Sequence, residues 1–221
     1  MSKLGQYLVD TKQFFFGRFG AICSVLFPAL IPINLVYVLS LINLGPSSDA
    51  TFLVFSISLA LYPLYQGALI LFIHREIQGG DSRSIGDLYQ TVLPLWSSLI
   101  VMYAMVLIAS AAGFALLVIP GLFIIARLSF TEFECLIHGK SPFEALQQSW
   151  RDTEENQFLL IVGLACIWAV TTLPVLFIQQ AISYESLSGA LAYFLLALLG
   201  SVITAPITIF RYRVYSLLKG V

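Results

Sequence analysis

Long apolar runs separated by short charged clusters dominate the pattern of this sequence. Five runs contain no Lys, Arg, Asp or Glu, and they cover residues 19–48, 50–73, 88–126, 156–184 and 186–210. A membrane-crossing helix needs about 20 apolar residues, so the run 88–126 is too long for one crossing. It contains the helix-breaking pair Pro120-Gly121, which predicts the tip of a tight helical hairpin. We therefore predict six transmembrane helices, near residues 20–42, 52–73, 95–118, 122–138, 157–181 and 188–210.

Three shorter amphipathic segments precede the first, third and fifth predicted crossings, at residues 4–15, 85–93 and 142–152. The third follows Ser141, which is spaced with Glu144 as a capping box, and Pro142 occupies its first helical position. We predict three helices on the cytoplasmic membrane surface. Each is followed by a crossing, a turn and a return helix, which indicates a threefold internal repeat. The alternative is that any membrane protein of this topology places amphipathic segments at its cytoplasmic edge.

Lysine and arginine residues are concentrated in every second connection between the predicted crossings. The connections 45–50 and 183–187 and the Pro120-Gly121 turn contain none, whereas the termini and the two longer connections contain all but Arg127. The positive-inside rule then predicts a multi-pass membrane protein with both termini in the cytoplasm. The residues that carry this prediction are Lys3, Lys12, Arg18, Arg75, Arg83, Lys140, Arg151, Arg211, Arg213 and Lys219.

The composition agrees with an all-α polytopic membrane protein formed by a single domain, residues 1–221. Hydrophobic residues make up 59% of the chain and charged residues only 10%, outside the range of soluble domains. A net charge of -1 excludes a broad basic surface for nucleic acid, so membrane lipids are the expected partners. Cys23, Cys135 and Cys166 lie in apolar runs without metal-ligand spacing, and no cofactor is expected.

The candidate site is a polar stripe on the second arm of the predicted hairpin. Arg127, Thr131, Glu134 and His138 are spaced i, i+4, i+7 and i+11, so a continuous helix would carry them on one face. Ionisable residues inside a membrane often mark a pathway, and the alternative is a structural hydrogen-bonding clamp between helices. We expect Arg127 to be held by Glu134 through Thr131, or by a carbonyl of another helix.

The region around the hairpin resembles a known family. It contains the turn Val118-Ile119-Pro120-Gly121, then Arg127, and then Ser141-Pro142-Phe143-Glu144-Ala145-Leu146 with Ser149-Trp150. Over residues 117–160 this pattern is similar to the YciC family of bacterial inner-membrane proteins and to the membrane domain attached to some glycerophosphodiester phosphodiesterases. Glu132 and Glu134 depart from that pattern. The resemblance implies the location and the fold, and it implies no catalytic residues.

These features favour a non-enzymatic protein that handles or transports a lipid or amphipathic small molecule, or that serves membrane homeostasis. One alternative is a non-catalytic accessory or scaffold subunit with a protein partner, and another is a membrane-embedded hydrolase using Glu132, Glu134 or His138. A transport path predicts a cavity lined by Arg127, Thr131 and Glu134, whereas a scaffold predicts that these groups satisfy one another. A hydrolase predicts a carboxylate and a histidine that converge on a cytoplasmic pocket.

Overall fold

The described part of the protein consists of helices joined by short connections. The structure is a computed structural model, and it describes residues 3–44, 48–80, 84–181 and 187–220. Parts of the predicted connections 45–50 and 183–187, and Arg83, lie outside the described residues. The elements are α1 (Lys3–Gly17), α2 (Phe19–Leu44), α3 (Ser48–Gln78), α4 (Ile85–Val92), the 3-10 turn η1 (Leu93–Leu95), α5 (Trp96–Leu116), α6 (Val118–Arg127), α7 (Thr131–His138), α8 (Pro142–Asp152), α9 (Gln157–Ala181), α10 (Leu187–Ile203) and α11 (Ala205–Lys219).

Five stretches of these helices are long and apolar enough to cross a membrane. They are Phe19–Asn43, Val54–Gln78, Ile85–Leu116, Gln157–Gln180 and Ser188–Lys219. The expected crossing at residues 122–138 is not among them. It is divided between α6, which has ten residues, and α7, which has eight. At 1.5 Å per residue α6 is only about 15 Å long, roughly half of a bilayer's hydrocarbon core.

The hairpin between α5 and α6 turns three residues earlier than predicted. Leu117 is the extended residue between the two helices (φ -168, ψ 165), and Pro120 and Gly121 lie within the first turn of α6. Proline is tolerated there because the first N–H groups of a helix have no intrahelical acceptor. The predicted tip at Pro120-Gly121 is therefore corrected to Leu117.

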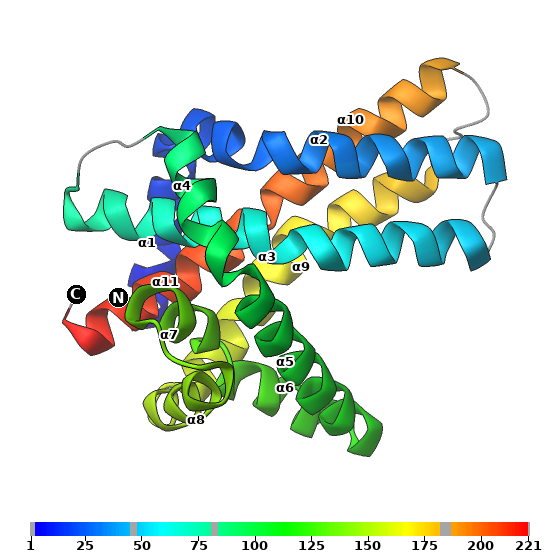
Figure 1. The fold of residues 1–221 in the computed structure, drawn as a ribbon. Helices are drawn as coiled ribbons and strands as arrows, with labels where there is room; N and C mark the ends of the chain where they lie inside the picture. Colours follow the sequence, from blue (N-terminus) through cyan, green and yellow to red (C-terminus); the bar gives the residue numbers. More distant parts are fainter. Residues whose placement is uncertain (1–2, 45–47, 81–83, 182–186, 221) are drawn as a thin grey trace.

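Three helical hairpins extend from one shared region (Figure 1). They are α2/α3, α5/α6 and α9/α10; the two helices of each pair contact one another, and α10 also contacts α2. The α5/α6 hairpin points away from the other two, and α7, α8 and α11 lie at the junction, which we call the hub. The hairpins carry many exposed apolar side chains, such as Ile108 and Phe177.

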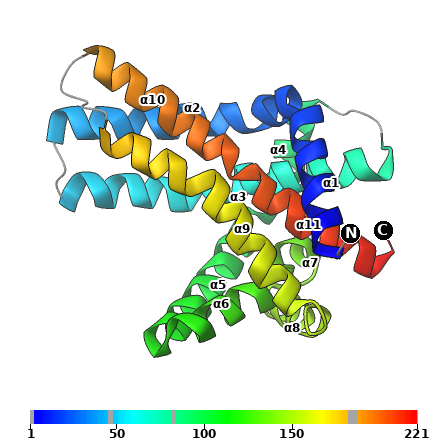
Figure 2. The same cartoon turned by 180° about the vertical axis from the view of Figure 1, so that it is seen from behind.

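Both chain ends lie at the hub. Figure 2 shows α1 lying across α11, and the rings of Tyr7 and Phe210 meet edge to face with centroids 6.4 Å apart. The Arg213 guanidinium lies 6.0 Å from the centroid of the Phe14 ring. The first and last described helices therefore end on the same side of the molecule.

An aromatic cluster forms the core of the hub. Its largest fully buried side chains are Tyr212, Tyr215, Phe130, Phe133 and Phe210. Phe133 contacts Tyr212 edge to face at 5.5 Å, and Tyr215 contacts Phe130 at 5.4 Å between centroids. Aromatic contacts of this kind add to the stabilisation from area burial alone. They bind α7 to α11, which together hold the charged groups described next.

Candidate functional site

The break between α6 and α7 is stabilised by side chains of α8 and of its C-cap residue, Thr153. The Arg127 carbonyl accepts hydrogen bonds from Ser149 Oγ at 2.8 Å and from Thr153 Oγ1 at 3.1 Å. The backbone N–H of Phe130 donates to Ser149 Oγ at 3.0 Å. Both hydroxyl-bearing residues are fully buried. Since a buried helix end is stable only when its free polar groups are paired, α8 supplies the partners that permit a break at residues 128–130.

Glu132 is the centre of a buried charge network. Its carboxylate accepts from Arg211 Nη1 at 2.9 Å and from Nη2 at 3.4 Å. Gln66 Nε2 approaches the same carboxylate at 3.4 Å and donates to Thr208 Oγ1 at 2.7 Å. The exposed side-chain fractions are 13% for Arg211 and 8% for Glu132. The network therefore joins α3, α7 and α11 across a region with little access to water.

Glu134 forms a second charge cluster two residues along α7. Its carboxylate lies 2.7 Å from Lys140 Nζ and 3.3 Å from Lys219 Nζ, and it accepts from the Tyr215 hydroxyl at 3.1 Å. Lys219 also lies 2.6 Å from a carboxylate oxygen of Asp152. Residues two apart on a helix point in different directions, which explains why Glu132 and Glu134 have separate partners.

We expect Glu134→Gln to destabilise the hub, because it leaves the ammonium groups of Lys140 and Lys219 without the carboxylate that they share. The thermal midpoint in detergent should therefore fall. The control is Glu154→Gln at an exposed position, and equal midpoints in the two variants would contradict a structural role for the Glu134 cluster.

The four residues of the predicted polar stripe do not lie on one continuous helix and do not form one face. Arg127 ends α6, whereas Thr131, Glu134 and His138 belong to α7. Thr131 Oγ1 donates to the Leu128 carbonyl at 2.9 Å and bridges nothing. Glu134 and His138 are linked through Tyr215, whose hydroxyl lies 2.8 Å from His138 Nε2 and donates to Glu134. The expected pairing of Arg127 with Glu134 is therefore replaced by two separate arrangements.

Arg127 is buried between aromatic rings. Its side chain is 7% exposed, and its guanidinium carbon lies 4.8 Å from the Trp150 ring centroid and 5.6 Å from that of Phe123. Within the described part of the chain, Nε and Nη1 have no hydrogen-bond partner. Stacking of a guanidinium on aromatic faces is worth about 0.5–2 kcal/mol, and here it joins the end of α6 to α8.

The cap of α8 has the contacts that the sequence predicted. The Ser141 backbone N–H and hydroxyl both donate to Glu144 Oε2, at 3.1 and 2.8 Å, and Pro142 is the first residue of α8. These hydrogen bonds hold the pKa of the Glu144 carboxyl below its ordinary value. The cap orients α8, whose Ser149 and Thr153 then reach the break between α6 and α7.

An apolar groove lies away from these charges, against α1 and the α9/α10 hairpin. It has a volume of about 800 Å³, and Lys12 is the only charged residue among those that line it. Its lining comes from α1 and the start of α2, from α9, and from α10 and α11: Leu8, Thr11, Lys12, Phe15, Phe16, Phe19, Cys166, Ile167, Val170, Thr171, Pro174, Val175, Ile178, Leu196, Leu199, Ile203 and Pro206. No residue of the predicted stripe lines it.

Sequence reasoning missed both the groove and the partners of the two carboxylates. Arg211 and Lys219 entered the sequence argument only as markers of the cytoplasmic side, and Gln66 did not enter it. The useful signal was that a carboxylate inside a membrane protein needs a cation nearby. The sequence offers those cations at the ends of the predicted crossings. It gives no sign of which cation meets which carboxylate.

The comparisons with known proteins identify no relative of this chain. No family model matches the chain, and neither a curated protein nor a solved structure matches it. The resemblance to the YciC family therefore stays a prediction.

Proposed function

We propose that this is a non-enzymatic inner-membrane protein that binds and handles an anionic lipid of the cytoplasmic leaflet. The groove between α1, α9 and α10 carries this proposal. Its lining on α9 extends from Cys166 to Ile178, which is about 18 Å along a helix axis. The groove follows α9 and is therefore parallel to the lipid tails when α9 crosses the bilayer. Apolar pockets with a few polar groups are typical of ligand sites.

Lys12 selects the kind of headgroup. It lies on α1, at the hub end of the groove, among residues that are otherwise uncharged. An acyl chain between α9 and α10 would bring a phosphate to this ammonium, and a basic residue near a membrane surface contributes about 1 kcal/mol to binding an anionic lipid. The proposed ligand is therefore a phosphatidylglycerol-like lipid with one chain in the groove.

The hub charges favour a structural role over a catalytic one. The Glu134 carboxylate, which an embedded hydrolase would need, is held by Lys140 and Lys219, and Glu132 is held by Arg211. Mutually satisfied groups are also what a scaffold subunit predicts. We assign that role to the hub itself, which anchors the three hairpins beside the groove.

The proposal can be tested by native mass spectrometry of the protein purified in mild detergent with added phosphatidylglycerol. Lys12→Gln should weaken binding about fivefold, and Val170→Trp should block the groove. The matched controls are Lys3→Gln, at the start of the same helix, and Val162→Trp, at a similarly lipid-exposed position of α9 outside the groove. Equal binding by all four variants would contradict a lipid site in this groove.

We also propose that both termini are cytoplasmic and that α6 and α7 together return the chain after α5. Five full crossings alone would put the two ends on opposite sides. The packing of α1 on α11 supports an even number of passages. In this arrangement α1, α4 and α8 lie at the cytoplasmic surface, each before one hairpin, and the three units descend from a threefold repeat.

Cysteine labelling tests this topology. Single cysteines at Asn43 and Ser188 should react with a membrane-impermeant maleimide added to intact cells, because these residues lie at the outer ends of α2 and α10. Cysteines at Ser84 and Leu217 should react only after the membrane is opened. External labelling at Leu217, which is 63% exposed, would contradict the proposed return of the chain.

A further inference from the structure

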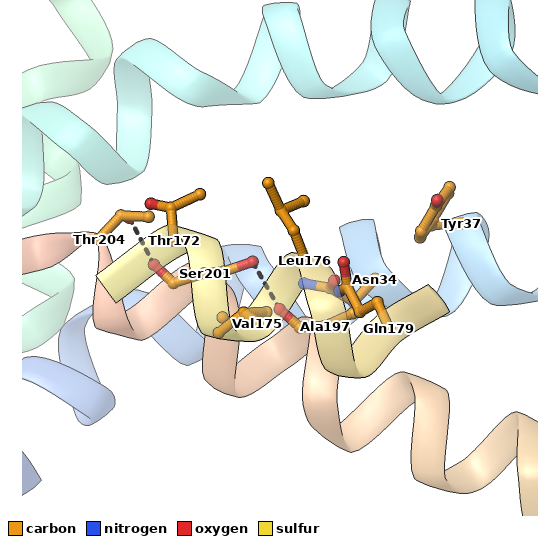
Figure 3. Close-up of a pocket in the computed structure, with 10 residues that line it drawn as sticks. Asn34, Tyr37, Thr172, Val175, Leu176, Gln179, Ala197, Ser201 and Thr204 are labelled. Atoms are coloured by element: carbon orange, nitrogen blue, oxygen red, sulfur yellow. Dashed lines mark hydrogen bonds between the residues drawn. The ribbon is translucent and has the colours of Figure 1, made fainter. Parts of the chain in front are cut away.

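A second cavity lies between α2, α9 and α10, and it differs in chemistry from the apolar groove. Its volume is about 290 Å³. Figure 3 shows its side chains spread along the helices, with Thr204, Thr172 and Ser201 toward one end and Asn34, Gln179 and Tyr37 toward the other. All six are polar and none is charged. The other lining residues are Val175, Leu176, Ala197 and Gly200.

These polar side chains do little to join the helices. Asn34 Nδ2 donates to the Leu30 carbonyl at 2.8 Å, Ser201 Oγ to the Ala197 carbonyl at 2.9 Å, and Thr204 Oγ1 to the Ser201 carbonyl at 2.7 Å. Each of these bonds joins residues that are three or four positions apart in the sequence. A structural clamp would use such groups across helices, as Tyr37 does with the Tyr193 hydroxyl at 3.2 Å.

The local bonds leave unused acceptor oxygens on side chains that line the cavity. A hydroxyl that donates once still has lone pairs, and an asparagine that donates through Nδ2 still has its carbonyl oxygen. Polar groups within a membrane-crossing region are unfavourable unless they meet a partner. A concentration of such oxygens around one cavity therefore points to a ligand that donates hydrogen bonds.

The dimensions of the cavity fit a small polar group that enters from the bilayer. Thr172 and Gln179 are seven residues apart on α9, which is about 10 Å along the axis. Gly200 and Val175 bring α10 and α9 together, since a Cβ at Gly200 would lie 2.8 Å from Val175 Cγ1. Val175 lines both this cavity and the apolar groove, so the two sites are on opposite sides of the α9/α10 contact.

We propose that this cavity binds the uncharged, hydroxyl-rich headgroup of a membrane lipid, such as a sugar linked to diacylglycerol. Each hydroxyl of such a group both donates and accepts hydrogen bonds, which matches the serine, threonine and amide groups of the lining. A phosphate would bring a charge to a site with no cation among the described residues that line it, and burial of an unpaired charge is strongly unfavourable. This site is independent of the anionic lipid proposed for the groove.

The test uses the full chain in nanodiscs, titrated with monoglucosyl-diacylglycerol and followed by native mass spectrometry. Thr172→Val and Ser201→Ala each remove a hydroxyl with little change in shape. Each should weaken binding about two- to tenfold, while phosphatidylglycerol binding should be unchanged. Val170→Trp in the groove is the reciprocal control and should affect only phosphatidylglycerol.

Three results would overturn the proposal. One is undiminished glucolipid binding in the Thr172→Val, Ser201→Ala double variant, provided that its thermal midpoint equals that of the parent protein. Another is a loss of phosphatidylglycerol binding in the same variant, which would make the cavity part of the anionic site. The third is binding of soluble methyl glucoside without binding of the glucolipid, which would exclude a lipid as the source of the headgroup.

Discussion

Arg211→Met is expected to destabilise the protein by about 3–5 kcal/mol, because it leaves the Glu132 carboxylate buried without its counter-charge. The carboxylate is bound by two guanidinium nitrogens, and both partners are largely shielded from water. Gln66 alone, at 3.4 Å, cannot replace a full positive charge. Thermal and denaturant unfolding in detergent would measure the loss.

A double variant distinguishes the effect of leaving one charge unpaired from the effect of changing the side-chain packing. Arg211→Met combined with Glu132→Gln removes both charges and should recover a large part of the lost stability, since an uncharged pair avoids an uncompensated ion. The control is Arg18→Gln. Arg18 lies 2.7 Å from Glu76, but its side chain is 57% exposed, and surface pairs contribute only about 0–1 kcal/mol. Strictly additive single effects would refute the coupling of Glu132 and Arg211.

Gly121→Val should disrupt the α5/α6 hairpin. A Cβ at Gly121 would lie 2.4 Å from Phe114 Cδ1 on α5, and one at Gly113 would lie 3.0 Å from the Cα of Gly121. The two glycines thus let the helices approach closely, and a branched side chain must push the Phe114 ring or the α5 backbone aside. Overpacking of this kind costs about 1–3 kcal/mol and should lower the amount of protein in the membrane.

The reference substitution is Gly20→Val. Gly20 is also helical, and a Cβ there would have no atom within 4 Å, so only the small helix-propensity change remains. Phe114→Ala introduced with Gly121→Val should restore part of the loss, because it removes the ring that the valine meets. If Gly20→Val and Gly121→Val accumulate equally, close packing of α5 on α6 does not limit stability.

The position of Gly121 in the hairpin shows which features the Pro120-Gly121 motif predicts and which it does not. The Pro-Gly pair correctly indicated that the run 88–126 folds back on itself. It did not locate the turn, because proline is compatible with the first turn of a helix and the chain reverses at Leu117. Glycine is needed there for the approach of two helices, and its φ is not positive in this structure.

The sequence by itself determined the helical class and most of the helices. Apolar runs long enough for a bilayer can only be helical when no partner strands exist, and the amphipathic segments at 4–15, 85–93 and 142–152 are indeed helices. The capping contacts of Ser141 and Glu144 were also predictable, because they join residues three apart. These properties depend on local spacing and need no knowledge of distant neighbours.

Only the tertiary structure decided what happens between Arg127 and Glu134. No proline or glycine marks residues 128–130, so the local sequence favours a continuous helix. The break depends on Ser149 and Thr153, about 20 residues further on, which satisfy the backbone groups that a break exposes. The same applies to the two carboxylates: Arg211 and Lys219 reach them from α11 because of how α11 packs on α7. Contacts over such sequence distances depend on packing, which the order of residues along one helix does not encode.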